Sequence, residues 1–203
     1  MKCKKTIAVL LALAMVFALL PASVQADGES GTMVIREGQY LEEVMEGWYA
    51  ENHGTVGTNN GTFIVNDGTV NTNNGTVTTN DGTVSSNSSS GKVEVNYGTV
   101  EHNYGRVAGN LATSDQDYGY ITYNEEGSMV GDNRGCVYLN DGTVANNYRT
   151  VEGNRNRTIT NTQNGTVGTN WRTVDTNYGT IGTNDNYYGE AVVSANYGTV
   201  QNN

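Results

Sequence analysis

A unit of seven residues, N-x-G-T-V-x-T, fills most of this chain and constrains its fold more than any other feature. The stretch NNGTVTTNDGTV (73–84) contains the unit almost twice, and variants of it run from residue 54 to residue 203. When the chain is aligned on the Val of G-T-V, most neighbouring Val slots are seven residues apart. Repetition at a fixed short period is typical of solenoids and other repeat arrays. The Val slots are Val56, Phe63, Val70, Val77, Val84, Val93, Val100, Val107, Ser114, Ile121, Val130, Val137, Val144, Val151, Ile159, Val167, Val174, Ile181, Val192 and Val200.

Each unit has the alternating pattern of a short strand. In a strand, neighbouring side chains point to opposite faces, so the Val slot shares a face with the residue two positions later. That later residue is mostly small or apolar, as in Thr58, Thr79 and Val95, whereas the residue between them is freely polar. We therefore expect Val and the later Thr to fill a thin core. Asn and Gly, which tolerate turn conformations, are expected to form the turns.

Short strands of this kind need neighbours, and identical units can supply them by stacking in a solenoid. Stacked Asn side chains could then bond to one another in columns. Two units per coil would give a flattened roll of 14 residues per turn, and three would give a triangular prism of 21. The turn residues Asn60, Asp67, Asn74 and Asp81 alternate with a period of 14, which favours the roll. About ten such coils would form a rod of ~50 Å.

Two other folds are compatible with parts of the pattern. Asn-Gly and Asp-Gly between alternating segments are strong hairpin signals, so an antiparallel meander is one alternative. Low hydrophobicity with a high net charge is typical of disorder, which is the second. We favour the parallel β-solenoid, because stacked coils reward the same residue in the same slot of every strand, and a meander does not. The absence of Pro after residue 26 also fits, because every interior strand needs its backbone N–H groups for pairing.

The repeat resembles, in architecture only, the short-repeat β-solenoids of bacterial surface proteins, such as the β-roll heads of trimeric autotransporter adhesins. The resemblance covers residues 54–203 and lies in the N-x-G-T-V type of repeat. Those heads have a different repeat sequence. The resemblance implies a structural or adhesive role at a cell surface. The nonapeptide calcium-binding repeat is absent from the sequence, so calcium is not implied.

Residues 1–26 have the three parts of a secretory signal peptide. Three lysines precede an apolar run, and small residues lead to Ala26. The style resembles Gram-positive bacterial signals, and the sequence after residue 26 contains no apolar run long enough to span a bilayer. We therefore expect a secreted or cell-surface location.

Residues 27–53 differ from the repeats and are predicted to form an N-terminal cap. A helical spacing is shown by Tyr40, Leu41, Val44, Met45, Trp48 and Tyr49, and a short strand, TMVI, precedes them. The sequence thus predicts an amphipathic α-helical cap on a solenoid that spans residues 54–203. The last unit, NYGTVQNN, shows no matching cap, so end-to-end self-association through the C-terminal coil is expected.

Composition excludes several classes of partner. Without the three lysines of residues 1–26, eight basic residues face 21 acidic ones, a net charge of −13. A chain this acidic repels phosphate backbones, so nucleic acid is not an expected partner. Cys136 is the one cysteine after residue 26, so it can form a disulfide only with another molecule.

Aromatic side chains in the turn slot between Asn and Gly are the strongest candidates for a binding site. The slot holds Asn or Asp in early units and aromatics later, and stacking would align these into one or two edges. The simplest interpretation is mutual stacking that stiffens the rod. The functional alternative is a ladder for glycans or a protein partner, with six arginines in the same half as added donors. The candidate contact residues are Tyr97, Tyr104, Tyr148, Trp171, Tyr178, Tyr188 and Tyr197, with Tyr118 in the same slot.

Signals for catalysis and for metal binding are weak. Asp115, Asp117, Glu125 and Glu126 lie in an irregular segment, and paired acids could hydrolyse glycosides, as in polysaccharide-cleaving β-helices. Solvated charges on a degenerate repeat explain them more simply. The two histidines, His53 and His102, occupy different slots without a ligand cluster. We expect no catalytic residue, no metal and no cofactor.

The predicted function is therefore that of an exported, non-catalytic structural or adhesive β-solenoid. A carbohydrate-binding module that uses the aromatic edge is the main alternative. A column of outward Thr residues, beginning with Thr55, Thr62 and Thr69, also fits an ice-binding surface. That alternative is less favoured, because the second outward slot often holds Glu, Asp, Gly or Asn and because Thr is in any case a common strand residue.

Overall fold

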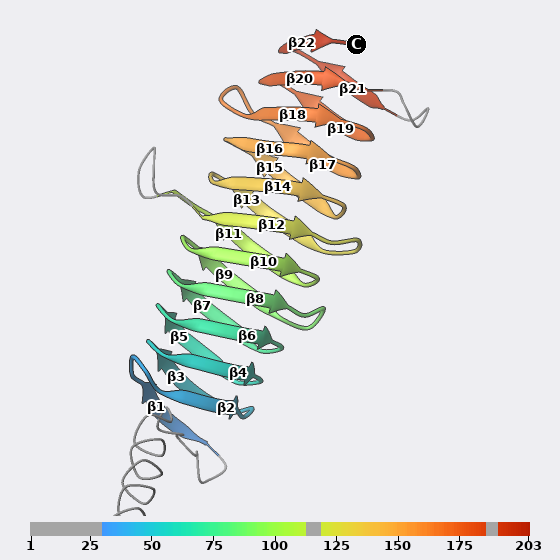
Figure 1. The fold of residues 1–203 in the computed structure, drawn as a ribbon. Coiled ribbons are helices and arrows are strands. Elements are labelled where there is room, and N and C mark those ends of the chain that lie inside the picture. Colours follow the sequence, from blue (N-terminus) through green and yellow to red (C-terminus); the bar gives the residue numbers. More distant parts are fainter. Residues whose placement is uncertain (1–29, 113–118, 186–190) are drawn as a thin grey trace, which may run out of the picture.

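The computed structural model describes residues 30–112, 119–185 and 191–203 and contains strands and turns but no helix in these ranges (Figure 1). The predicted signal peptide lies outside the described residues. The strands are β1 (Gly31–Ile35), β2 (Tyr40–Val44), β3 (Trp48–Asn52), β4 (Thr55–Asn59), β5 (Thr62–Asn66), β6 (Thr69–Asn73), β7 (Thr76–Asn80), β8 (Thr83–Asn87), β9 (Lys92–Asn96), β10 (Thr99–Asn103), β11 (Arg106–Asn110), β12 (Tyr120–Asn124), β13 (Met129–Asn133), β14 (Cys136–Asn140), β15 (Thr143–Asn147), β16 (Thr150–Asn154), β17 (Arg157–Asn161), β18 (Thr166–Asn170), β19 (Thr173–Asn177), β20 (Thr180–Asn184), β21 (Val192–Asn196) and β22 (Thr199–Asn202).

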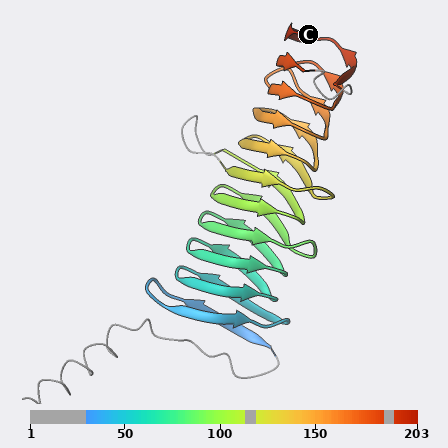
Figure 2. The same cartoon turned by 45° about the vertical axis from the view of Figure 1, so that its right-hand side comes forward.

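The strands form two parallel sheets that face each other in a flattened roll. One sheet contains the eleven odd-numbered strands and the other the eleven even-numbered strands, here called the odd sheet and the even sheet. Figures 1 and 2 show the coils stacked along one axis, one strand of each sheet per coil. In the regular coils, Val56 pairs with Val70 and Val70 with Val84, a step of two repeats. The predicted parallel solenoid with two repeats per coil is confirmed, and the triangular prism, the meander and disorder are wrong.

The Val slots form one apolar column in each sheet. Val56, Val70 and Val84 of the even sheet are completely buried, as are Phe63, Val77 and Val93 of the odd sheet. Because the two columns meet between the sheets, each coil adds two apolar side chains to a continuous core. This is the part of the core that the repeat pattern predicts.

Asn side chains form a second, polar column, whose position inside the roll was not predicted. The Asn that we expected in the turn instead ends each strand from β3 to β21, and its side chain is completely buried from Asn52 through Asn177. Each of these amides donates from Nδ2 to Oδ1 of the Asn one coil later, over 2.6 Å from Asn52 to Asn66 and 2.8 Å from Asn59 to Asn73. A further bond runs from Asn59 Nδ2 to the Thr76 carbonyl, 3.3 Å away. The predicted inward position of the later Thr is wrong, because Thr58 is only half-buried.

Asn and Val cannot both face inward in a strand that alternates strictly, because two residues separate them. The strand ladder accommodates the Val and the Asn by an interruption in the pairing. Val56 pairs with Val70 and Thr58 with Thr72, while the intervening Gly57 is left out of the pairing. A buried amide without a partner would be costly, whereas a continuous column satisfies every amide. The Asn column therefore sets the register of the strands as firmly as the Val column does.

Two predicted Val slots are wrong for this reason. At β17 the completely buried slot holds Thr158, which pairs with Val144 and Val174, and Ile159 lies in the next, partly exposed slot. At β21 the paired residue is Val193, not Val192. In both strands the core residue lies three positions before the ladder Asn. The predicted slot at Ser114 lies outside the described residues.

The predicted helical cap is also wrong. The segment forms β2 and β3, and the short strand expected before it is β1. Buried residues at Leu41, Val44 and Trp48 have a helix-like spacing, but they belong to two strands separated by a turn at Gly47, whose φ is 84°. The first coil still differs from the rest, because Ile35 and Val44 occupy the slots that later hold the ladder Asn residues. An apolar pair thus closes the N-terminal end of the core.

Candidate functional site

The predicted aromatic residues lie on two opposite edges of the roll. The turns that follow odd-numbered strands form one edge, here called the odd edge, and the turns that follow even-numbered strands form the even edge. Tyr97, Tyr148, Tyr178 and Tyr197 lie on the odd edge, whereas Tyr104 and Trp171 lie on the even edge. Tyr118 and Tyr188 lie outside the described residues. The structure therefore splits the predicted ladder into two groups, each with a different set of neighbours.

On the odd edge the aromatics form local pairs. The rings of Tyr178 and Tyr197 are stacked with centroids 5.2 Å apart. The Arg134 guanidinium carbon lies 5.0 Å from the centroid of the Tyr148 ring. Since the turn after β17 has Thr162 rather than an aromatic in this position, the two pairs do not form one continuous row. Tyr197, with 72% of its surface exposed, is the most accessible of them.

On the even edge, His102 organises a small aromatic cluster. Its ring is stacked against Tyr123, with centroids 5.0 Å apart, and against Tyr104, with centroids 6.2 Å apart. Its Nδ1 lies 2.9 Å from Oε1 of Glu125. The other histidine, His53, pairs in the same way with Asp67, 2.8 Å away, on the odd edge. Both histidines therefore have carboxylate partners.

A charged hollow of about 480 Å³ lies on the even edge beyond this cluster. Arg155 pairs with Asp141 across 3.6 Å, and Asn156 Nδ2 donates to the Asp141 carbonyl over 2.8 Å. The longer turn after β12 contributes two acidic side chains, so cationic, anionic and amide groups all face the same space. The lining residues are Glu125, Glu126, Asp141, Arg155, Asn156 and Arg172.

Trp171 precedes the lining residue Arg172 in the chain but does not itself line the hollow. Its Nε1 donates to Oδ2 of Asp185 over 3.2 Å, which holds the indole at the edge. Its ring approaches Gly153 so closely that a Cβ there would lie 2.9 Å from Trp171 Cζ3 and 2.9 Å from Leu139 Cδ1. Glycine at this position therefore gives the indole its room.

Sequence reasoning missed Tyr123, Leu139 and Gly153, although a signal for them exists. All three occupy the slot just before the ladder Asn in successive even strands, after His102 in β10. Earlier even strands hold Thr58, Thr72 and Ser86 in that slot. If the repeats had been aligned at a period of two units rather than one, this column of the even sheet would have been distinguished from the corresponding slots of the odd sheet.

The predicted acidic and cysteine positions have definite surroundings. Glu125 is engaged by His102 and Glu126 lines the hollow, while Asp115 and Asp117 lie outside the described residues. Cys136 in β14 is only 7% exposed, and burial, with a smaller effect of the Glu152 carboxylate, raises the pKa of its thiol to about 11. A buried, protonated thiol reacts slowly. An intermolecular disulfide stays a prediction that these two observations do not favour.

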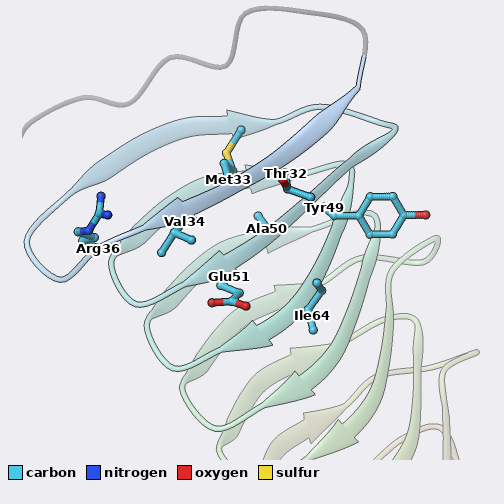
Figure 3. A pocket seen from close by; sticks show the side chains of 8 residues that line it. All are labelled: Thr32, Met33, Val34, Arg36, Tyr49, Ala50, Glu51 and Ile64. Atoms are coloured by element: carbon cyan, nitrogen blue, oxygen red, sulfur yellow. The ribbon is translucent and has the colours of Figure 1, made fainter.

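A second hollow, of about 420 Å³, lies on the outer face of the odd sheet at the first coils (Figure 3). Its lining combines aliphatic and aromatic side chains with one cation and one anion. No sequence signal had marked it as a site, since all of its residues except Ile64 belong to the segment predicted as an N-terminal cap. The lining residues are Thr32, Met33, Val34, Arg36, Tyr49, Ala50, Glu51 and Ile64.

In the described ranges, His, Cys, Asp and Glu side chains form no group of three that could hold a metal ion. Those ranges also contain no helix with the length and apolarity needed to cross a membrane. Comparison of the chain with known proteins gives no match to a family model, to a curated protein or to a solved structure.

Proposed function

We propose that this chain is an exported, non-catalytic structural rod that presents adhesive contact residues on its edges. The observation that supports it best is the continuity of the core along both sheets. Val and Asn columns run from the first coils to the last, and every ladder bond connects one coil to the next. A fold held together by contacts between neighbouring coils is suited to extension and stiffness.

The Asn columns add directional bonds to a core that would otherwise be a soft stack of Val side chains. Asn80, for example, donates to Asn96 over 2.6 Å, to the Thr99 carbonyl over 3.2 Å and to the Gly82 carbonyl over 3.2 Å. A hydrogen bond of this kind contributes about 1 kcal/mol net, and leaving a buried partner unpaired costs about 1–3 kcal/mol. Sliding or bending one coil against the next would break several of these bonds together.

The edges supply the contact residues of the proposal. Tyr178 and Tyr197 on the odd edge are both exposed, and Arg134 lies over Tyr148 on the same edge. Tyrosine and arginine are enriched in protein interfaces, because they combine apolar surface with hydrogen-bond donors. A rod that carries such pairs at intervals along one edge could bind a repetitive partner at several points, which raises its apparent affinity.

Two measurements test export and stiffness. Cell fractionation with N-terminal sequencing should place the chain outside the cytoplasm with Asp27 as its first residue. Small-angle X-ray scattering should give a rod whose folded part is ~50 Å long, since each sheet has eleven strands at ~4.8 Å spacing. A cytoplasmic chain that keeps residues 1–26 would refute export, and a compact or variable particle would refute the rod.

Adhesion has its own test. Binding of the chain to the producing cells and to extracellular matrix would be compared with that of a Tyr178→Ser/Tyr197→Ser variant, with Thr162→Ser on the same edge as the matched control. We expect the double variant to lose most of the binding and the control to keep it. Equal binding by all three would show that this pair makes no contact.

Carbohydrate binding is a second candidate, favoured by the charged hollow on the even edge. Its two arginines and three carboxylates offer donors and acceptors, and the indole of Trp171, next to the lining residue Arg172 in the chain and bonded to Asp185, would supply the ring surface that a sugar needs. On a glycan array, binding that is lost in Trp171→Ala but kept in Tyr178→Ala would assign the site to the even edge. The opposite result would assign the site to the odd edge. If the unmodified chain binds no glycan on the array, the result favours a role as a spacer.

A further inference from the structure

Two longer turns on the even edge flank a third hollow, which neither candidate function uses. Residues 88–91 connect β8 to β9 and residues 125–128 connect β12 to β13, whereas only residues 104 and 105 connect β10 to β11. Figure 1 shows that the turns after β8 and β12 project further from the roll than the turn between them. A hollow of about 350 Å³ lies at these turns. Its lining residues come from all three turns and from the first residues of the odd strands that follow them.

Those first residues depart from the repeat at the same coils as the turns do. Lys92, Arg106 and Met129 begin β9, β11 and β13, and the register pairs Arg106 with each of the other two. The odd strands β5, β7, β15 and β19 all begin with Thr. Two cations thus replace Thr where the turns are long, so one change in side chains and one change in turn length meet in the same hollow.

This hollow is positively charged, whereas the other two combine both signs. Lys92 and Arg106 line it, and among the described residues no carboxylate does. Their strands lie ~4.8 Å apart, and like charges on neighbouring strands repel. Lys92 pairs with Glu94, but within the described residues Arg106 takes part in no ion pair. Arg157, which begins β17, has Asp175 as its partner. The Arg106 guanidinium therefore lacks the anion that its counterpart in β17 has.

The turn after β8 adds a hydroxyl group on a backbone that is held in place. Ser90 Oγ donates to the Asn74 carbonyl over 3.1 Å, and Ser88 Oγ lies 3.2 Å from Ser90 Oγ. These contacts attach the turn to the preceding coil. Ser89 is exposed and lines the hollow, as does Tyr104 from the short turn. Serine and tyrosine hydroxyls beside Arg and Lys are typical donors to phosphate oxygens.

We propose that this hollow binds a phosphate or sulfate group. The Arg106 guanidinium supplies paired N–H donors to two oxygens of the anion, and the Lys92 ammonium supplies a point charge beside it. The Tyr104 ring and the Met129 side chain, 47% and 39% exposed, offer apolar surface to the body of a ligand that carries the group as an ester. Such a site is independent of the adhesive odd edge and of the glycan candidate.

Two features oppose anion binding and set its strength. Glu94 competes with the anion for Lys92, and the chain after residue 26 is strongly acidic. We therefore expect weak binding, which Glu94→Gln should tighten by roughly two- to fivefold, because it releases an exposed ion pair. A gain of affinity is diagnostic, since damage to the fold would only weaken binding.

An NMR titration of residues 27–203, which include every described residue, tests the site. The probes are inorganic phosphate, inorganic sulfate and phenyl phosphate, with chloride at equal ionic strength as the blank. We expect saturable shifts of the amides in the turns after β8, β10 and β12. Tighter binding of phenyl phosphate would identify an ester as the ligand, and equal binding would identify the free ion. Shifts that never saturate, or that centre on Arg155 and Arg172, would overturn the proposal.

Charge substitutions test the role of the guanidinium. Arg106→Gln should weaken binding of each probe about tenfold or more, the worth of a charge-assisted hydrogen bond. Arg36→Gln is the matched control, because it removes the same charge from an exposed arginine that has no ion pair in the described residues. It should leave the affinity unchanged. Binding that survives Arg106→Gln, or that Glu94→Gln fails to tighten, would overturn the assignment.

Shortening the turn after β8 tests the shape of the hollow. Deletion of Ser89 and Ser90 leaves N-S-G, the form of the regular turn, and should lower the affinity about tenfold or more because one wall is lost. Deletion of Gln163 and Asn164 shortens the turn after β17 in the same way and should leave binding intact. Circular dichroism checks that both shortened chains are folded. Equal binding by the two would refute the contribution of the turn.

Discussion

Thr158 is the one defect in the otherwise apolar Val column of the described chain, and replacing it tests the account of the core. Thr158 is completely buried in β17, between Val144 and Val174 in the same sheet. Its Oγ1 has no hydrogen-bond partner. Thr158→Val exchanges the hydroxyl for a methyl group of similar size, so the side chain keeps its shape and matches both neighbours. The substitution should therefore stabilise the protein.

The magnitude follows from the buried hydroxyl. A buried polar group without a partner costs about 1–3 kcal/mol, and this cost is removed. For a chain of this length each kcal/mol moves the melting temperature by roughly 2–4 °C, so an increase of roughly 2–12 °C is expected. Thermal and urea unfolding would be compared with Thr143→Val, a half-exposed position in the preceding odd strand. That control should change stability by less than about 0.5 kcal/mol.

Unfolding of stacked repeats can proceed by segments, so hydrogen exchange at β17 should be measured beside the global transition. We expect slower exchange in β15, β17 and β19 and little change in β3 or β5. A Thr158→Val variant that is equally or less stable than the parent would refute the reasoning. Such a result would mean that the hydroxyl is satisfied in solution and that the Asn column does not dictate the register at this strand.

Three further predictions follow from the ladder, the edge and the thiol. Asn73→Ala should lower the free energy of unfolding by about 2–6 kcal/mol, because it leaves two buried ladder partners unpaired. The neighbouring Asn74→Ala, in a turn, should lower it by less than about 1 kcal/mol. Equal losses for the two variants in urea unfolding would contradict the ladder. Gly153→Ala should displace the indole of Trp171, since the new Cβ would lie 2.9 Å from Trp171 Cζ3. The displaced indole should shift its fluorescence to the red. An unchanged spectrum would mean that the ring does not lie against Gly153. Burial holds the proton on Cys136, so its contribution to stability is complete below pH 9.0, the ordinary pKa, and is lost as the pH rises through about 11. Iodoacetamide should therefore label the folded chain slowly at pH 8 and the unfolded chain quickly, and rapid labelling of the folded chain would contradict the burial.

The period and the Val column were predictable because they depend on local pattern alone. A step of seven residues, a β-branched residue in one slot and Gly in another are sufficient to define strands and turns. The alternation of Asn60, Asp67, Asn74 and Asp81 then gives the coil size, which the structure confirms. Nothing in this reasoning requires knowledge of contacts between distant residues.

A column of stacked Asn side chains was expected, but its burial inside the roll was not predictable by the same reasoning, because Asn is usually found in turns and at the surface. Its burial is favourable only when each amide has another amide one coil away, as Asn59 has in Asn73. That partner is identified only after the coil size is known. The errors at Ile159 and Val192 have the same origin, since aligning on Asn161 and Asn196 would have placed both strands correctly.

The cap and the even-edge hollow depended on turns that the pattern does not specify. Leu41, Val44 and Trp48 fit one helical face and two short strands equally well, and the turn at Gly47 decides between them. The hollow requires the side chains of four turns to converge, as Asp141 and Arg155 do from the turns after neighbouring even strands. Candidate residues on such an edge can be proposed from sequence, but their grouping follows only from the fold.

The direction of the ladder bonds gives the rod an electrical polarity. Every ladder amide donates toward the following coil, from Asn52 to Asn66 at one end and from Asn184 to Asn203 at the other. Aligned amide dipoles add, as peptide dipoles do along a helix. The two columns should thus produce an axial macrodipole, positive toward the last coil and negative toward the first. Anions would be attracted to one end of the rod and cations to the other, which gives an oriented field to a molecule whose outer faces repeat.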